Sequence, residues 1–83
     1  MYIQYDMNLL QLKIGERAVV DTVGTEHSLR VRLGALNIRE GSCVRVLHIA
    51  PFGGGILLNA EGIRVAVRRS IAQKIQVHAE ELL

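Results

Sequence analysis

The stretch from Arg32 to Gly55, RLGALNIREGSCVRVLHIAPFGGG, constrains the fold more than any other part of this chain. It contains the end of a short amphipathic helix, a tight turn, a strand, and a loop with one proline and three glycines. Short elements separated by turn residues are typical of a small barrel built mainly from strands. The stretch holds no pattern of catalytic residues, so it indicates a fold and not a reaction.

The helix is predicted from three leucines that recur at i, i+4 and i+7 and therefore share one face: Leu29, Leu33 and Leu36. Ser28 is the expected N-cap, because its hydroxyl can accept hydrogen bonds from amides of the first turn. Asn37 is expected to end the helix with a positive φ, since asparagine is second only to glycine in the left-handed conformation. Gly41 then predicts a turn into the next strand.

Five strands are predicted from segments rich in valine and isoleucine: residues 16–23, 43–49, 56–60, 63–67 and 74–78. In the second strand, Cys43, Arg45, Leu47 and Ile49 form the more apolar of the two alternating sets. Gly62 belongs to a tight hairpin turn, Ser70 is the expected cap of a single helical turn, and residues 7–12 are expected to dock as an extended or one-turn segment. These elements predict a mainly β fold, a small SH3-like barrel of about five strands with one short helix after the first strand.

Length and composition predict one domain, residues 1–83, in a reducing compartment. A single cysteine excludes an internal disulfide framework. The longest nearly apolar run, residues 49–58, is too short to span a bilayer. The N-terminus has neither the basic region nor the apolar run of a signal peptide. We therefore expect a cytoplasmic protein that does not insert into the membrane.

The net charge of +2 conceals a basic middle: seven arginines and two acidic residues lie between Arg30 and Arg69. Such a segment can steer the protein toward acidic partners. The alternative is a solvated surface on which the arginine stems cover apolar atoms.

No residue pattern predicts catalysis or a cofactor. His27, His48, His78 and Cys43 lack a metal-ligand spacing such as CxxC or HExxH, so we predict no preformed metal site, although folding could bring two of them together. The glycines at 53–55 do not form a phosphate cradle, because a strand and not a helix is expected to follow them.

Nucleic-acid binding is an alternative function for a small barrel with many arginines. Such barrels usually stack bases on aromatic side chains. Only Tyr2, Tyr5 and Phe52 are aromatic here, so we expect no nucleic-acid partner.

Three motifs in order resemble the ferrous iron transport protein A (FeoA) family, over about residues 9–77. The first is carried by Arg32, Leu33, Leu36, Ile38 and Gly41, the second by Ala50, Pro51 and Gly53, and the third by Val67, Arg68, Arg69, Ala72 and Ile75. The chain departs from the family pattern at Asn37, which replaces a glycine, at Glu40, which replaces a proline, at Phe52, which replaces a leucine, and at Gly54-Gly55, which replace Asp-Pro.

The resemblance implies a small cytoplasmic accessory protein of bacterial ferrous iron uptake, without enzymatic activity. Its implied partner is the membrane permease FeoB, whose cytoplasmic part carries a GTP-binding domain. Similar domains are fused to iron- or manganese-dependent repressors, so a stand-alone regulator-type interaction domain is the other alternative. The oligomeric state and the effect of contact on the permease are not predicted.

Two features are expected to form the contact surface. One is the loop Pro51-Phe52-Gly53, whose phenylalanine would be an anchor if it is exposed, or a lid on the core if it folds back. The other is the helix with Leu33 and Leu36, flanked by Arg30 and Arg32.

Overall fold

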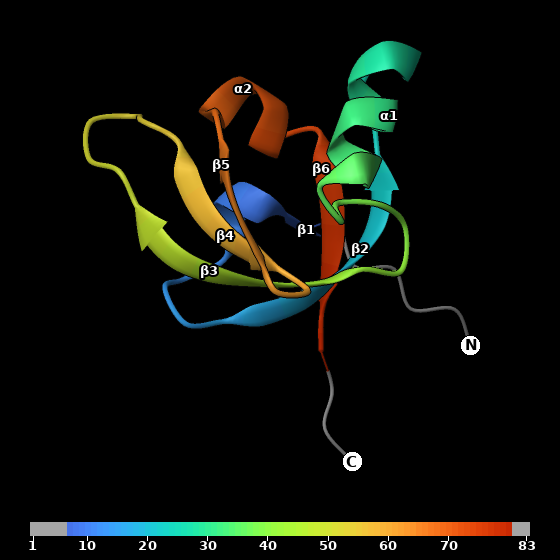
Figure 1. Cartoon of the computed structure of the whole chain (residues 1–83). Coiled ribbons are helices and arrows are strands. Elements are labelled where there is room, and N and C mark those ends of the chain that lie inside the picture. Colours follow the sequence, from blue (N-terminus) through green and yellow to red (C-terminus); the bar gives the residue numbers. More distant parts are fainter. Residues whose placement is uncertain (1–6, 81–83) are drawn as a thin grey trace.

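The computed structural model describes residues 7–80, which form an antiparallel sheet with short helices packed against it (Figure 1). The elements are β1 (Met7–Asn8), the 3-10 helix η1 (Leu9–Gln11), β2 (Arg17–Val23), α1 (His27–Ala35), β3 (Cys43–Ile49), β4 (Ile56–Ala60), β5 (Ile63–Val67), α2 (Arg69–Ala72) and β6 (Ile75–Ala79). The strand order across the sheet is β1-β6-β2-β3-β4-β5.

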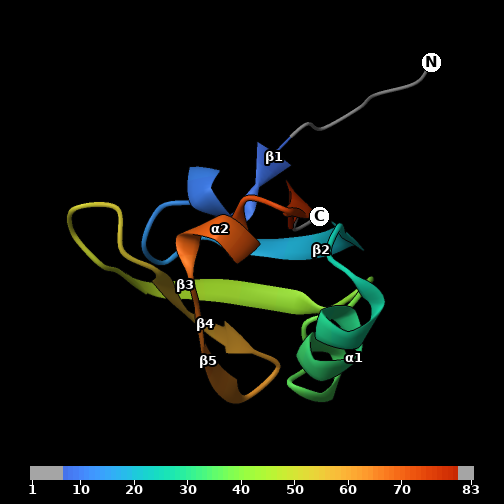
Figure 2. The same ribbon diagram turned by 90° about the horizontal axis from the view of Figure 1, so that it is seen from above.

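The mainly β fold class is confirmed, but the strand count is six rather than five, and the helix α1 follows the second strand and not the first. The additional strand β1 pairs with β6 through Met7↔Val77 and Asn8↔Gln76. It was missed because two residues carry no alternation, and because Asn8 at once caps η1. Among residues 7–80 no pairing joins β1 to β5, so the barrel is open between them. Figure 2 shows α2 above the strands in the curve of the sheet.

The core is aliphatic, since the strands supply alternate inward side chains. Its largest fully buried members are Leu9, Ile38, Leu58, Ile75, Val20, Val44, Val46 and Val77. In β3 the buried side chains are Val44 and Val46, although the other alternating set is the more apolar one. The pairing register of β3 with β4 shifts between Val46 and His48, after which His48 and Ile49 are exposed. This irregularity carries the strand end and the following loop away from the core.

The start of α1 differs from the sequence prediction. The N-cap is Glu26, whose side chain forms no capping bond, and Ser28 lies within the first turn. The Ser28 hydroxyl donates to Glu26 Oε1 at 3.1 Å instead of accepting from a backbone amide. Similarly, α2 begins at Arg69 with Arg68 as its N-cap, so Ser70 is not a cap. Neither helix therefore uses the side-chain cap that its serine suggested.

The end of α1 is as predicted. Asn37 has a φ of 66°, and its backbone N–H donates to Gly34 O at 3.0 Å. The N–H of Ile38 donates to Leu33 O at 2.9 Å, which completes a Schellman motif. Gly41 and Gly62 also have positive φ, of 88° and 96°, at the two predicted turns. No helix within residues 7–80 is long and apolar enough to cross a bilayer.

Candidate interaction surfaces

The loop between β3 and β4 carries a fully exposed phenylalanine. Phe52 is 104% exposed, so its ring packs on nothing else in the described chain. Figure 1 shows this loop projecting from one side of the molecule. The lid alternative is therefore wrong, and Phe52 is available as an anchor for another molecule.

The backbone holds Phe52 in a strained conformation. Phe52 and Gly53 have φ of 57° and 75°, and the N–H of Gly54 donates to Pro51 O at 3.2 Å. Two central residues with positive φ make this a type I′ turn. A phenylalanine with positive φ is uncommon and costs on the order of 1 kcal/mol. Strained backbone conformations occur more often at functional sites than elsewhere. The positive φ of Phe52 therefore supports, together with its exposure, a binding role for this residue.

Glycine is required at 54 and 55 because other groups approach closely. A Cβ at Gly54 would lie 2.7 Å from Ala50 Cβ, and one at Gly55 would lie 2.5 Å from Val67 O. The N–H of Ala50 also donates to Gly55 O at 2.9 Å, which closes the base of the loop. These glycines let β3, β4 and the end of β5 come together beneath the exposed ring.

Helix α1 supplies a different surface from the one that its leucines predict. Leu33 is only 5% exposed and packs in the core, so it offers little open surface, and its contact with a partner stays a prediction. Leu36, at 41%, is the leucine of the predicted pair that reaches the surface. Arg30 and Arg32 are exposed. The i, i+4, i+7 pattern identified the face of the helix that packs on the core. The pattern alone does not distinguish such a face from a partner-binding face, because both use the same residue types.

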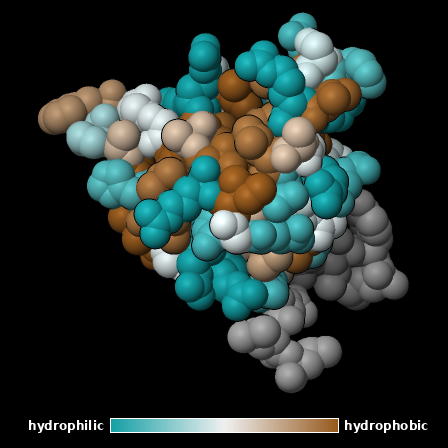
Figure 3. Space-filling model, viewed as in Figure 1, coloured by the Kyte–Doolittle hydropathy of each residue, from teal (hydrophilic) through white to brown (hydrophobic). Residues whose placement is uncertain are grey.

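A groove of about 170 Å³ lies between α1, β5 and α2. Its apolar lining comes from Leu29, Leu33, Leu36, Val65, Val67 and Ile71. Arg32 and Arg68 also line it, and no acidic residue does. In Figure 3, apolar atoms gather in the middle of the molecular face between hydrophilic borders.

The loop and the helix lie on opposite sides of the molecule in both ribbon views (Figures 1 and 2). The element between them is β5. A second depression, of about 480 Å³, lies at the base of the loop and is lined by His48, Ala50 and Leu57 among others. Ala66 and Arg68 line both depressions. The sequence does not predict β5 as a surface element. Its alternating pattern indicates which side chains are buried, but not which strand has an unpaired edge.

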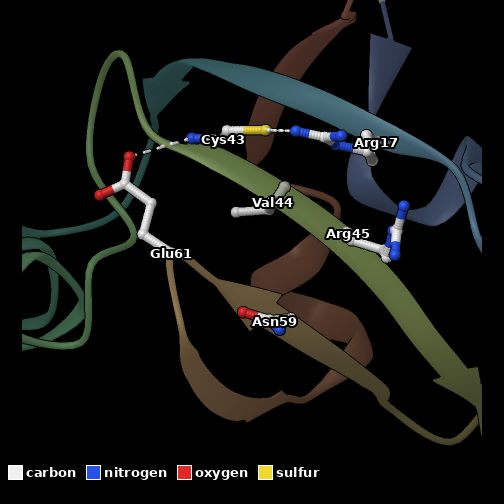
Figure 4. Close-up of a pocket in the computed structure, with 6 residues that line it drawn as sticks. All are labelled: Arg17, Cys43, Val44, Arg45, Asn59 and Glu61. Carbon is white, nitrogen blue, oxygen red and sulfur yellow. Dashed lines mark hydrogen bonds between the residues drawn. The ribbon is translucent and has the colours of Figure 1, made fainter.

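The cysteine lies in a third depression, of about 310 Å³, on strands β2, β3 and β4 (Figure 4). Cys43 Sγ is 3.8 Å from Arg17 Nη2 and 3.6 Å from Glu80 Oε2, and Arg17 Nε is 2.8 Å from Glu80 Oε2. The hydrogen bond with Cys43, followed by the charge of Glu80, raises the pKa of Arg17 above its ordinary value.

The histidines are not brought together with the cysteine. His78 pairs with Asp21 on the neighbouring strand β2, whereas His27 begins α1 and His48 is exposed near the end of β3. Within residues 7–80, no group of three or more His, Cys, Asp or Glu side chains could hold a metal ion. The absence of a preformed metal site remains a prediction.

Comparison with known families matches the FeoA domain over residues 7–79. The solution structure of the FeoA protein from Chlorobium tepidum is 40% identical, with a TM-score of 0.83 over 88% of this chain and 70% of that chain. FeoA from Stenotrophomonas maltophilia, complexed with zinc and described as a prokaryotic SH3 domain protein, is 32% identical, with a TM-score of 0.73 over 87% and 89%. A manganese-dependent transcriptional repressor, 23% identical with a TM-score of 0.76 over 89% of this chain and 41% of its own, shares the fold. The comparison with curated proteins gave no significant match.

Proposed function

Because this chain belongs to the FeoA domain family, whose members are small SH3-like proteins associated with ferrous iron transport, we propose that it acts by contact with the cytoplasmic part of the permease FeoB. Its place of action is then the cytoplasm. It performs no catalysis in this role: it presents a surface to the permease.

The observation that carries this proposal is the exposed ring of Phe52. A phenylalanine that buries nothing in its own domain contributes little to folding, yet the chain holds it on a strained turn. Aromatic side chains that enter a partner pocket are frequent binding hot spots. The loop therefore has the features of an anchor for a partner, and the basic residues that follow it on β5 and α2 favour an acidic one.

The nucleic-acid alternative has less support. Phe52 is the only aromatic residue between positions 7 and 80, so that part of the chain offers no row of rings for stacking bases. Tyr2 and Tyr5, the other aromatic residues, lie outside the described residues. The likeness to the manganese-dependent repressor extends to the fold and does not identify a function for this chain.

The anchor is tested by Phe52→Ala and the purified cytoplasmic part of FeoB. We expect the affinity to fall by at least about tenfold to thirtyfold, the loss of a typical hot spot, because the buried ring area is lost. The melting temperature should stay unchanged, since the ring packs on nothing in the described chain.

Val31→Ala is the matched control, because Val31 is 57% exposed and lies on α1, on the other side of the molecule from the loop. It should leave the affinity unchanged. Unchanged affinity for Phe52→Ala would remove the loop from the proposed contact. If the unmodified protein does not bind FeoB at all, the proposed partner is wrong.

A further inference from the structure

Strand β5 presents an unpaired edge. It is the last strand of the sheet and pairs with β4 alone among the described residues. The hairpin between them has a two-residue turn, Glu61-Gly62, with φ of 49° and 96°, and the residues flanking it pair as Ala60↔Ile63. In such a hairpin the flanking pair exchanges both of its hydrogen bonds, and bonded pairs then alternate along the ladder.

This register determines which backbone groups face outward. Ile63, Val65 and Val67 direct their N–H and C=O groups toward β4, so Arg64 and Ala66 direct theirs toward the open edge. The close approach of Gly55 to Val67 O agrees, because it places the Val67 carbonyl on the β4 side. Two donors and two acceptors are thus exposed along the outer edge of β5.

The residues of this edge also line the apolar groove described above. Val65, Ala66 and Val67 form its β5 wall, and α1 forms the opposite wall with leucines of its packed face. A strand added beside β5 would therefore gain backbone hydrogen bonds on one side and an apolar cavity for a side chain on the other. Edge addition of this kind is a recurring mode of peptide recognition.

We propose that the edge of β5 binds an extended acidic segment of the permease as a seventh strand, with one aliphatic side chain in the groove. This inference rests on the proposed function and identifies the chemistry of the partner. The charge supports the acidic character: Arg32 and Arg68 line the groove, Arg64 is exposed on β5, and none of the three forms a salt bridge with another described residue. Carboxylates beside the added strand would pair with these arginines.

A second copy of this chain is a poorer occupant of the same edge. If two β5 strands paired antiparallel about Ala66, Arg64 of one copy would lie opposite Arg68 of the other. Like charges directly opposite each other destabilise a strand pair. The arginines thus disfavour self-association in that register, and two edges that both carry Arg64 and Arg68 repel each other in any register.

The test uses Ala66→Pro in the full chain, with the cytoplasmic part of FeoB as the probe. Proline removes only the outward N–H at position 66 and spares the ladder with β4, a position at which edge strands tolerate proline. We expect at least a tenfold loss of affinity with little change in melting temperature. Val31→Ala is the control, because Val31 is exposed on α1 and does not line the groove; its affinity should change less than twofold. Arg68→Gln should weaken binding severalfold, and more at low salt than at high salt.

Amide hydrogen exchange on the unmodified protein gives a readout that does not depend on how the proline variant folds. Bound permease should slow exchange at Arg64 and Ala66 by tenfold or more, whereas contact through side chains alone would leave these amides unprotected. If FeoB binds but neither the proline effect nor the protection is seen, the strand addition is wrong and the proposed function stands. If FeoB does not bind, both fail. If the two amides are protected in a dimer without FeoB, the occupant is a second copy and the acidic segment is excluded.

Discussion

At the scale of single residues, Asn37 joins the end of α1 to the β4–β5 hairpin. Its φ of 66° completes the helix end, and its Nδ2 donates to Ala60 O at 3.3 Å. Asn37→Val should cost about 2 kcal/mol of unfolding free energy, because a β-branched residue is strained at positive φ and the hydrogen bond is lost. Urea unfolding monitored by circular dichroism measures this.

Asn37→Gly is the matched control. Glycine relieves the backbone strain but also loses the bond to Ala60, so the two effects should offset each other to within about 0.5 kcal/mol. A valine variant as stable as the parent would contradict the capping argument. The φ of Asn37 was predictable from sequence because it follows from local chemistry alone, whereas the exposure of Phe52 was not, since the residues that could cover a loop are distant in the chain.

At the scale of elements, α1 contains a glycine that its packing does not need. A Cβ built at Gly34 would meet nothing within 4 Å. Gly34→Ala should raise the unfolding free energy by roughly 0.5–1 kcal/mol, because alanine is the better helix former. Gly62→Ala should instead lower the unfolding free energy, since a φ of 96° strains any residue with a side chain at that position. Thermal unfolding of both variants checks the pair, and a destabilised Gly34→Ala would show that the helix end has a packing constraint.

The positions of α1, β2, β3, β4, β5 and β6 follow from the sequence to within a few residues, because each carries its own periodicity. Three features do not follow. The two-residue strand β1 exists only through its pairing with β6, the irregularity after Val46 exists only through its pairing with β4, and the open edge of β5 depends on which strands pair at all. The groove beside α1 is equally non-local, so the leucine pattern predicted the helix but not that Leu33 would be mostly buried between α1 and the sheet.

At the scale of the whole molecule, we expect no stoichiometric binding of Fe²⁺ in anaerobic calorimetry. The histidines are spread over separate elements, and Cys43 contacts Arg17 and Glu80. Any weak heat should be compared with that of a Cys43→Ser variant, which identifies a contribution from the thiol. One Fe²⁺ per chain at micromolar affinity or tighter would overturn the prediction.

The pairing of β1 with β6 also places the two ends of the described fold side by side. Met7 lies opposite Val77, so residue 80 is only about 10 Å farther along the strand direction at ~3.3 Å per residue. A domain whose ends are neighbours can be inserted into a host loop, or circularly permuted by a short linker, without disturbing its core. New termini opened at Pro51–Gly54 would leave β1, β6 and the core continuous. The same geometry allows this fold to form part of a longer chain. In the manganese-dependent repressor, for example, the matching region is 41% of the chain.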